Sequence, residues 1–287
     1  MRDIIKQREI NSTQTAFPDM TSRVITISSG KGGVGKTNFT LNLAINLRKR
    51  NKRIVLIDAD FGLANVEVLF GIIPRYHFGD VLASKVVMKD ALTEGPLGLK
   101  FLSGGAGMSS LSNITEQEIS VLTESFDYLD TISDFILIDT GAGMSDKVTD
   151  LIKSSEETIL VTTPEPTAVT DAYALIKNMK DMRYVPEFKL VVNCVTNPKE
   201  GVEIYEKLNK VSSKFLDISI EYLGAIPADK NLVRAVKSQK PVSLCYPDTD
   251  SSKSIENISL KLLDMETAAA SRSGAAMFMK KLLNFGR

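Results

Sequence analysis

The sequence contains little that supports cysteine or histidine chemistry. It has two cysteines, Cys194 and Cys245, and one histidine, His77, among 287 residues. The cysteines lie far apart and form no C-x-x-C pattern, so we expect two reduced thiols rather than a disulfide or a metal site. A single histidine argues against histidine-based acid–base catalysis.

Net charge, an export signal and a long apolar run are also lacking. Lys plus Arg and Asp plus Glu number 35 each, so no overall field draws the chain to nucleic acid. The first eight residues contain no apolar signal-peptide core, and no run of about 18 apolar residues occurs. We therefore expect a cytoplasmic protein that is neither exported nor membrane-spanning and has no direct nucleic-acid partner.

The strongest positive signal is a phosphate-binding loop that matches G-x-x-x-x-G-K-[ST]. Its residues are Gly30, Lys31, Gly32, Gly33, Val34, Gly35, Lys36 and Thr37. Glycines let the backbone aim N–H groups at phosphate oxygens, while Lys36 reaches the β- and γ-phosphates and Thr37 ligates Mg²⁺. A β-branched run over 24–27 and a helical pattern over 38–49 flank the loop, as this motif requires. The sequence therefore predicts binding of a nucleotide with Mg²⁺.

Strand-like and helix-like segments alternate along the rest of the chain. Short β-rich runs occupy 53–58, 99–102, 134–139, 158–162, 189–195 and 221–226, and helical patterns occupy 116–129, 146–153, 170–181 and 202–213. This alternation predicts parallel pairing with ligands at the carboxyl ends of the strands. We expect a single α/β P-loop NTPase domain with a mostly parallel central sheet flanked by helices. The predicted divisions are a polar extension over 1–21, the ATPase domain over 22–266, and a hinge with a terminal helix over 267–287.

Acidic residues follow two of the predicted strands. Asp58 ends the run at 53–58, and Asp60 follows it after one intervening residue. Two acids at this spacing are suited to binding Mg²⁺ and its water. Aspartates after strands also cap turns, which is the structural alternative. Asp139 ends a hydrophobic run in the Walker B arrangement, where it is expected to hold a metal-bound water. Phosphoryl transfer needs mainly positioning and charge neutralisation, which these groups supply.

The segment at 31–37 resembles the deviant Walker A motif of the MinD/ParA family, in which a second lysine directly follows the first glycine. The resemblance implies an ATPase that forms a homodimer when ATP is bound. Lys31 would cross the interface to the partner's ATP, so that catalysis depends on dimerisation. Within the same family pattern, Asp60 polarises the attacking water and Asp58 supports the metal region.

The resemblance also implies where adenine would bind. The family pattern places an asparagine after a late strand and a Pro-x-Asp sequence after the next one. Asn193, Pro227 and Asp229 occupy those positions. An asparagine in a turn and a proline after a strand also occur for purely structural reasons.

Three further stretches resemble the flagellar number regulators of this family, the FlhG group. They cover 139–143, 162–173 and 226–241, and similarity extends over about 22–263. The resemblance implies a switch that cycles between cytoplasm and membrane to regulate flagellar number or placement. It also implies flagellar basal-body components and the GTPase FlhF as partners. The group's N-terminal Asp-Gln-Ala-x-x-Leu-Arg element has no clear match in 1–21, so the resemblance does not extend to activation of FlhF through that segment.

The segment at 275–285 predicts a basic amphipathic helix. At 100° per residue its larger apolar residues share one arc, with lysines opposite. Such a helix suits an anionic membrane surface and resembles the family's membrane-targeting sequence. It also fits a helix that packs on its own domain, or one that folds back without ATP and is released on dimerisation. The predicted membrane-binding residues are Phe278, Lys280, Lys281, Leu282 and Phe285.

Other functions of the same family compete with this one. A MinD-like division-site or ParA-like positioning ATPase is the main alternative, although a DNA-binding ParA needs a basic surface stripe. An iron–sulfur reductase of the nitrogenase iron-protein type needs cysteines near 103–105 and after Asp139, and neither place has one. A non-hydrolysing scaffold is disfavoured because Lys31, Asp60 and Asp139 are all present.

Overall fold

The computed structural model describes residues 21–60, 65–104, 116–265 and 273–285. Its centre is a sheet with the strand order β3-β4-β2-β5-β1-β6-β7-β8. The strands are β1 (Arg23–Ser29), β2 (Ile54–Ala59), β3 (Thr93–Glu94), β4 (Lys100–Ser103), β5 (Phe135–Ala142), β6 (Glu157–Thr162), β7 (Glu187–Val195) and β8 (Glu221–Pro227). The short β3 pairs antiparallel with β4, and every other neighbouring pair of these strands is parallel.

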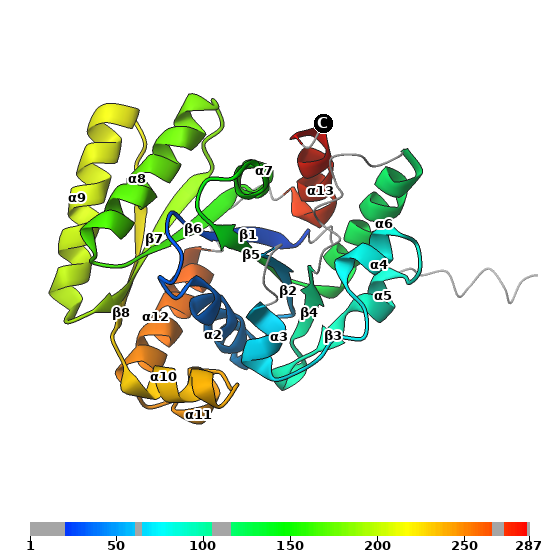
Figure 1. Cartoon of the computed structure of the whole chain (residues 1–287), viewed down its shortest axis with the longest axis horizontal. Coiled ribbons are helices and arrows are strands. Elements are labelled where there is room, and N and C mark those ends of the chain that lie inside the picture. Colours follow the sequence, from blue (N-terminus) through cyan, green and yellow to red (C-terminus); the bar gives the residue numbers. More distant parts are fainter. Residues whose placement is uncertain (1–20, 61–64, 105–115, 266–272, 286–287) are drawn as a thin grey trace, which may run out of the picture.

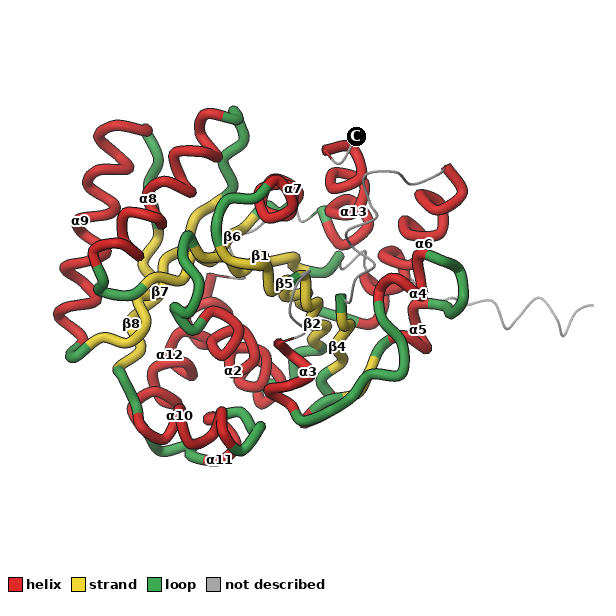
Figure 2. Tube along the Cα trace, in the orientation of Figure 1, coloured by secondary structure: helices red, strands yellow, loops and turns green. Residues whose placement is uncertain are grey.

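Helices cover both faces of this sheet (Figures 1 and 2). One face carries α2 (Lys36–Lys49), α3 (Asn65–Phe70), α10 (Lys230–Lys237), α11 (Val242–Cys245) and α12 (Asp250–Asp264). The other face carries α4 (Phe78–Leu82), α5 (Met88–Ala91), α6 (Glu116–Ile132), α7 (Asp146–Ser154), α8 (Pro166–Asp181), α9 (Pro198–Leu216) and α13 (Gly274–Phe285). A 3₁₀ turn, η1 (Pro96–Gly98), precedes β4.

Burial on both faces explains the apolar strand sequences. Every residue of β1 and β2 is buried, as parallel strands between two helical layers require. In β1, Ile25 and Ile27 pack with α2, whereas Val24 packs with the layer that contains α6 and α13. The predicted single α/β domain with a mostly parallel sheet is therefore confirmed, and all six β-rich runs form strands.

Several elements were not expected from the sequence. The predicted helices correspond to α2, α6, α7, α8, α9 and α13, whereas β3 and the helices α3, α4, α5, α10, α11 and α12 were missed. Most of these are short. The longer α12 is rich in serine, a poor helix former, and Ser251, Ser252 and Ser259 are nevertheless buried where it packs against β8 and α2. Tertiary packing thus overrides local propensity there.

The terminal helix α13 lies on the sheet side that carries α6 and α7, and it contacts both (Figure 1). Residues 267–272 of the predicted hinge over 267–274, and most of the predicted N-terminal extension, lie outside the described residues. None of the helices in the described ranges is both long enough and apolar enough to cross a bilayer.

Candidate functional site

Three glycines give the phosphate loop between β1 and α2 its shape. Gly33 and Gly35 have φ angles of 79° and 86°, which residues with a side chain rarely adopt. A Cβ atom on Gly30 would lie 2.4 Å from the main chain of Asp171 in α8. The loop is therefore packed closely against α8 at its start and turns left-handed before α2 begins.

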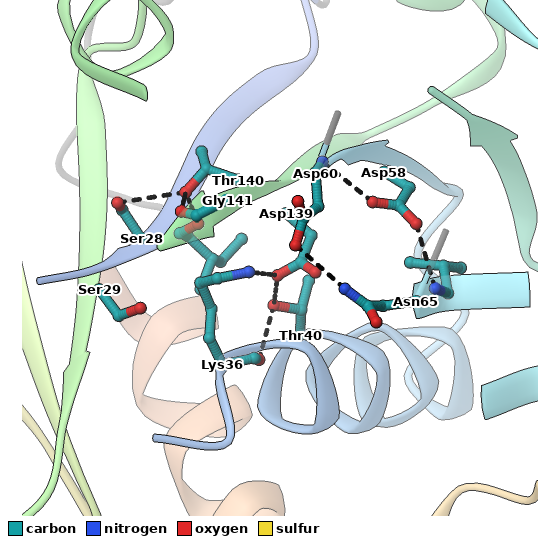
Figure 3. A network of polar contacts seen from close by, with 12 residues as sticks. Ser28, Ser29, Lys36, Thr40, Asp58, Asp60, Asn65, Asp139, Thr140 and Gly141 are labelled. Atoms are coloured by element: carbon teal, nitrogen blue, oxygen red, sulfur yellow. Dashed lines mark hydrogen bonds and ion pairs between the residues drawn. The ribbon is translucent and has the colours of Figure 1, made fainter. Parts of the chain in front are cut away.

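Lys36 and Asp139 form a buried ion pair beside this loop (Figure 3). Lys36 Nζ lies 2.9 Å from Asp139 Oδ1, and Thr40 donates its hydroxyl proton to the same oxygen at 2.9 Å. The side chains of Lys36 and Asp139 are 7% and 0% exposed. Asp139 Oδ2 is also buried and has no hydrogen-bond partner among the described residues. A buried carboxylate oxygen without a partner is costly, so this atom fits a ligand such as a metal-bound water.

Asp58 ends β2 with both carboxylate oxygens turned to main-chain N–H groups. Oδ1 accepts from the N–H of Asp60 at 3.1 Å, and Oδ2 accepts from the N–H of Val66 at 3.1 Å (Figure 3). Burial raises the pKa of Asp58 to about 7, with the hydrogen bond from Val66 opposing this rise and the charge of Asp139 adding to it. The parallel pairing of β2 with β5 places Asp58 directly opposite Asp139.

Asp60 lies between Asn65 and the carboxyl end of β5. Asn65 donates from Nδ2 to Asp60 Oδ2 at 3.0 Å (Figure 3). A Cβ atom on Gly141 would lie 3.6 Å from Asp60 Oδ1, so the glycine-containing end of β5 runs close to this carboxylate. The structure therefore places Asp58, Asp60 and Asp139 at the carboxyl ends of the adjacent strands β2 and β5, and metal binding by these residues stays a prediction.

Lys31 is paired within its own chain. Its Nζ lies 2.7 Å from Glu165 Oε2 and donates to Thr167 Oγ1 at 2.9 Å, at the start of α8. The side chains of Lys31 and Glu165 are 38% and 65% exposed, so the pair faces solvent. Contact with a partner's nucleotide stays a prediction.

The residues expected near adenine come from neighbouring strand ends. In the pairing of β7 with β8, Asn193 lies opposite Ile226, and Val195 lies opposite Pro227. Asn193 donates from Nδ2 to the main-chain oxygen of Val34 in the phosphate loop at 2.8 Å. The Asp229 carboxylate caps α10 by accepting from the N–H of Asn231 at 2.7 Å, and it also accepts from Ser251 Oγ at 2.6 Å. Adenine contacts from these residues remain predictions.

The predicted membrane-binding face of α13 is docked on the domain. Phe278 and Leu282 are 2% and 5% exposed, and the Phe278 ring stacks on Phe126 of α6 with centroids 6.4 Å apart. Phe285 is 38% exposed. Lys280 is exposed and Lys281 is half-buried. The helix thus adopts the packed arrangement that the sequence left open, and its membrane contact is untested.

Sequence reasoning missed three residues that complete the site. Thr40 lies one helical turn after Lys36, which is the spacing that places two side chains on one helix face. Asn65 follows Asp60 by five residues across 61–64, which lie outside the described residues. Glu165 belongs to the stretch 162–173, whose sequence indicated a family resemblance and no role for this residue. Only Thr40 had a signal in the sequence, namely its i, i+4 position.

Comparisons with known proteins identify the family of the chain. Residues 20–263 match the model of the ParA family, described as NUBPL iron-transfer P-loop NTPase. Antiactivator FleN of Pseudomonas aeruginosa is 34% identical over 261 residues, which cover 91% of this chain and 93% of that protein. The flagellum site-determining protein YlxH of Helicobacter pylori is 36% identical over 271 residues, which cover 92% and 90%.

Solved structures of division proteins share the fold. The chain matches the MinC:MinD cell division protein complex of Aquifex aeolicus with a TM-score of 0.68 and 27% identity, covering 88% of this chain and 100% of that one. A MinD from Pyrococcus horikoshii, solved with Mg-ADP, has a TM-score of 0.68 at 23% identity, covering 87% and 100%, and shows the fold alone. From its phosphate loop, its acidic strand ends and these matches, the chain belongs to the ParA/MinD family of P-loop NTPases.

Proposed function

We propose that this chain is a Mg²⁺-dependent ATPase that dimerises on ATP and thereby regulates flagellar number or placement at the membrane. The observation that carries the ATPase is the buried Lys36–Asp139 pair next to the glycine loop, with Asp139 Oδ2 left without a partner in the described chain. The flagellar assignment is supported by the similarity to YlxH, which is named a flagellum site-determining protein and matches 92% of this chain.

The residues at the loop fit ATP and Mg²⁺. Lys36 carries its positive charge to the point where the β- and γ-phosphates would lie, and the loop N–H groups would bind their oxygens. Thr37, Asp58 and Asp139 would hold Mg²⁺ directly or through water. When bound, the ion would neutralise charge on the phosphates.

Asp60 is the group that would orient the attacking water. Asn65 fixes one of its oxygens at 3.0 Å, and Gly141 at the end of β5 lies beside the other. A carboxylate that is held in place before the reaction begins requires little reorganisation in the transition state. Asp60 therefore acts in the proposed mechanism by positioning and polarising water, while Lys36 and Lys31 compensate phosphate charge.

Dimerisation would require Lys31 to exchange Glu165 for the partner's nucleotide. The pair is solvent-exposed, so it contributes less than about 1 kcal/mol and is readily broken. Release of α13 in the dimer would expose Phe278 and Leu282 for contact with an anionic membrane surface, beside Lys280 and Lys281. The proposed partners are a second copy, the membrane, flagellar basal-body components and the GTPase FlhF.

Gel filtration and liposome flotation test this proposal most directly. The chain with a non-hydrolysable ATP analogue and Mg²⁺ should elute as a dimer and float with anionic vesicles, whereas the ADP form should remain monomeric and sediment. Lys36→Ala, which removes a phosphate ligand, is the control that should behave like the ADP form. Equal flotation with both nucleotides would contradict the switch.

A cellular experiment separates the flagellar role from a division or partition role. Deleting the gene in the source organism should change the number or position of flagella seen by electron microscopy. Misplaced septa or lost plasmids with normal flagella would favour a MinD-like or ParA-like function instead.

A further inference from the structure

Asn193 joins the end of β7 to the phosphate loop. Its Nδ2 donates to the main-chain oxygen of Val34 at 2.8 Å across 159 residues of sequence, and the residue is 6% exposed. The acceptor is a carbonyl oxygen, which requires a donor, so the amide nitrogen and not its oxygen faces Val34. One buried side chain therefore connects the strand to the loop.

An irregularity in β7 accompanies this contact. Cys194 has a φ of 58°, and the pairing with β8 shifts register between Asn193 and Val195. A non-glycine residue with positive φ is uncommon and strained, and strand irregularities redirect side chains. Asn193 is buried whereas Cys194 is exposed. The backbone is therefore strained at Cys194, the residue that directly follows Asn193.

Gly35 leaves the space that this amide occupies. A Cβ atom on Gly35 would lie 2.3 Å from Asn193 Nδ2, which is closer than a Cβ atom approaches a non-bonded heavy atom in folded proteins. The φ of Gly35 is 86°, which also favours glycine. Gly35 is therefore required by its own backbone angle, and a larger residue there would displace the Asn193 amide from Val34.

The bond to Val34 determines the direction of the next N–H group. In a trans peptide the C=O and N–H bonds point in opposite directions, and the described chain has no cis peptide. Holding the Val34 oxygen toward Asn193 therefore turns the N–H of Gly35 to the opposite side. N–H groups of such loops bind phosphate oxygens.

We infer that Asn193 is a positioning residue for the phosphates: it fixes the Val34–Gly35 peptide so that the Gly35 N–H faces the triphosphate. This inference rests on the proposed ATPase. It differs from an adenine contact, because it acts at the phosphate end of the nucleotide and predicts an effect on ligands that have no base.

Calorimetric titration with ATP and with inorganic tripolyphosphate, each with Mg²⁺, tests the inference. Asn193→Ala should weaken both ligands by the same factor, about fivefold to tenfold, the amount expected for one buried hydrogen bond. The ratio of ATP to GTP affinity should stay unchanged. Weaker ATP binding with unchanged tripolyphosphate binding, or an altered ATP-to-GTP ratio, would overturn the inference in favour of an adenine contact.

Two further variants serve as a control and as a near-isosteric replacement. Asn197→Ala is the matched control, because Asn197 lies four residues later, is exposed and caps α9 by accepting from the N–H of Glu200 at 3.1 Å. It should leave both affinities unchanged. Asn193→Asp keeps the shape of the side chain but turns a carboxylate toward the Val34 oxygen, so it should weaken both ligands more than Asn193→Ala does.

Urea unfolding of each variant shows whether it is folded at the titration temperature. If Asn193→Ala is not folded, the near-isosteric Asn193→Asp replaces it in the test. A folded Asn193→Asp protein with unchanged tripolyphosphate affinity would overturn this inference but not the proposed ATPase. A wild-type chain that binds neither ATP nor tripolyphosphate would overturn the proposed ATPase as well.

Discussion

The ammonium of Lys31 lies 2.7 Å from the carboxylate of Glu165 in the same chain. Both side chains are substantially exposed, so solvent screening keeps this pair below about 1 kcal/mol. The pair therefore holds the Lys31 side chain at the start of α8 of its own chain, through a contact that a stronger anion can replace. A partner's triphosphate would be such an anion under the proposed function.

Replacing Lys31 tests whether it acts across an interface. Lys31→Ala should leave the monomer folded and able to bind ATP, because the Lys31 ammonium bonds exposed side chains at the start of α8. It should abolish the dimer that forms with a non-hydrolysable ATP analogue, as measured by light scattering. Glu165→Ala is the matched control, and it should retain the dimer and strengthen it by no more than about fivefold. A normal dimer of Lys31→Ala would reduce Lys31 to a loop cation.

Replacing Asp60 separates hydrolysis from binding. Asp60→Ala should abolish ATP hydrolysis while ATP affinity stays near wild type, because the carboxylate acts on water rather than on the bound phosphates. Asn65→Ala, which removes the hydrogen bond to Asp60 Oδ2, should slow turnover about tenfold without abolishing it. Phosphate release and calorimetric titration measure the two effects. Wild-type turnover of Asp60→Ala would end its assignment.

Truncation tests the terminal helix. Deleting residues 274–287 should retain ATP binding and remove liposome flotation. It should also lower the urea midpoint, since each buried apolar side chain such as Phe278 contributes about 1.5–3 kcal/mol. In full-length protein, Phe278→Glu should weaken flotation more than Lys280→Ala does, because it places a charge in the apolar face. Flotation of the truncated chain would show that another surface binds the membrane.

Asp130 of α6 offers a way to loosen the docked helix without changing it. Its Oδ1 accepts from the N–H of Ala275 at 2.9 Å, and its Oδ2 accepts from the N–H of Ala276 at 3.2 Å. Loss of such a cap costs about 1 kcal/mol. Asp130→Ala should therefore raise flotation of the ADP form about fivefold. Asp127→Ala, on the same helix with an exposed side chain, should have no effect.

A buried charge cluster at the opposite end of the sheet predicts pH-dependent stability. Glu157 binds Arg23 at 2.6 Å and Lys189 at 2.9 Å. Burial raises the pKa of Glu157, but the hydrogen bond and charge of Arg23, with Lys189, outweigh it and hold the pKa below the ordinary 4.5. A lowered folded-state pKa adds stability that is present above about pH 4.5 and is lost as the pH falls through the folded value.

The corresponding variant measures that stability. Glu157→Ala should lower the free energy of unfolding at pH 7 by about 3–5 kcal/mol, because it removes the carboxylate that pairs with the buried guanidinium of Arg23. Lys189 keeps its ion pair with Glu187 at 2.9 Å. The difference from wild type should shrink as the pH falls from about 4.5 to the lower pKa that Glu157 has in the folded state. Glu256→Ala breaks only the exposed pair with Arg50 and should change stability by less than about 1 kcal/mol. Equal urea midpoints of Glu157→Ala and wild type at pH 7 would contradict this account.

Local signals were sufficient for the α/β fold and for the centre of the site. Continuous apolar runs such as 134–139 can be buried only between two layers, so their alternation with helical patterns predicted the parallel sheet. Lys36, Asp58, Asp60 and Asp139 were found because each stands at a strand end or in the glycine loop, where parallel topology brings side chains together.

Contacts between distant segments had no such signal. The amide of Asn193 meets Val34 only because β7 ends beside the loop, and Glu165 meets Lys31 only because α8 starts there. The amphipathic pattern of α13 determined that one face is apolar. Only the tertiary structure decided that α6 and α7 cover that face, because hydrophobic burial is non-directional and any apolar surface of suitable shape satisfies it.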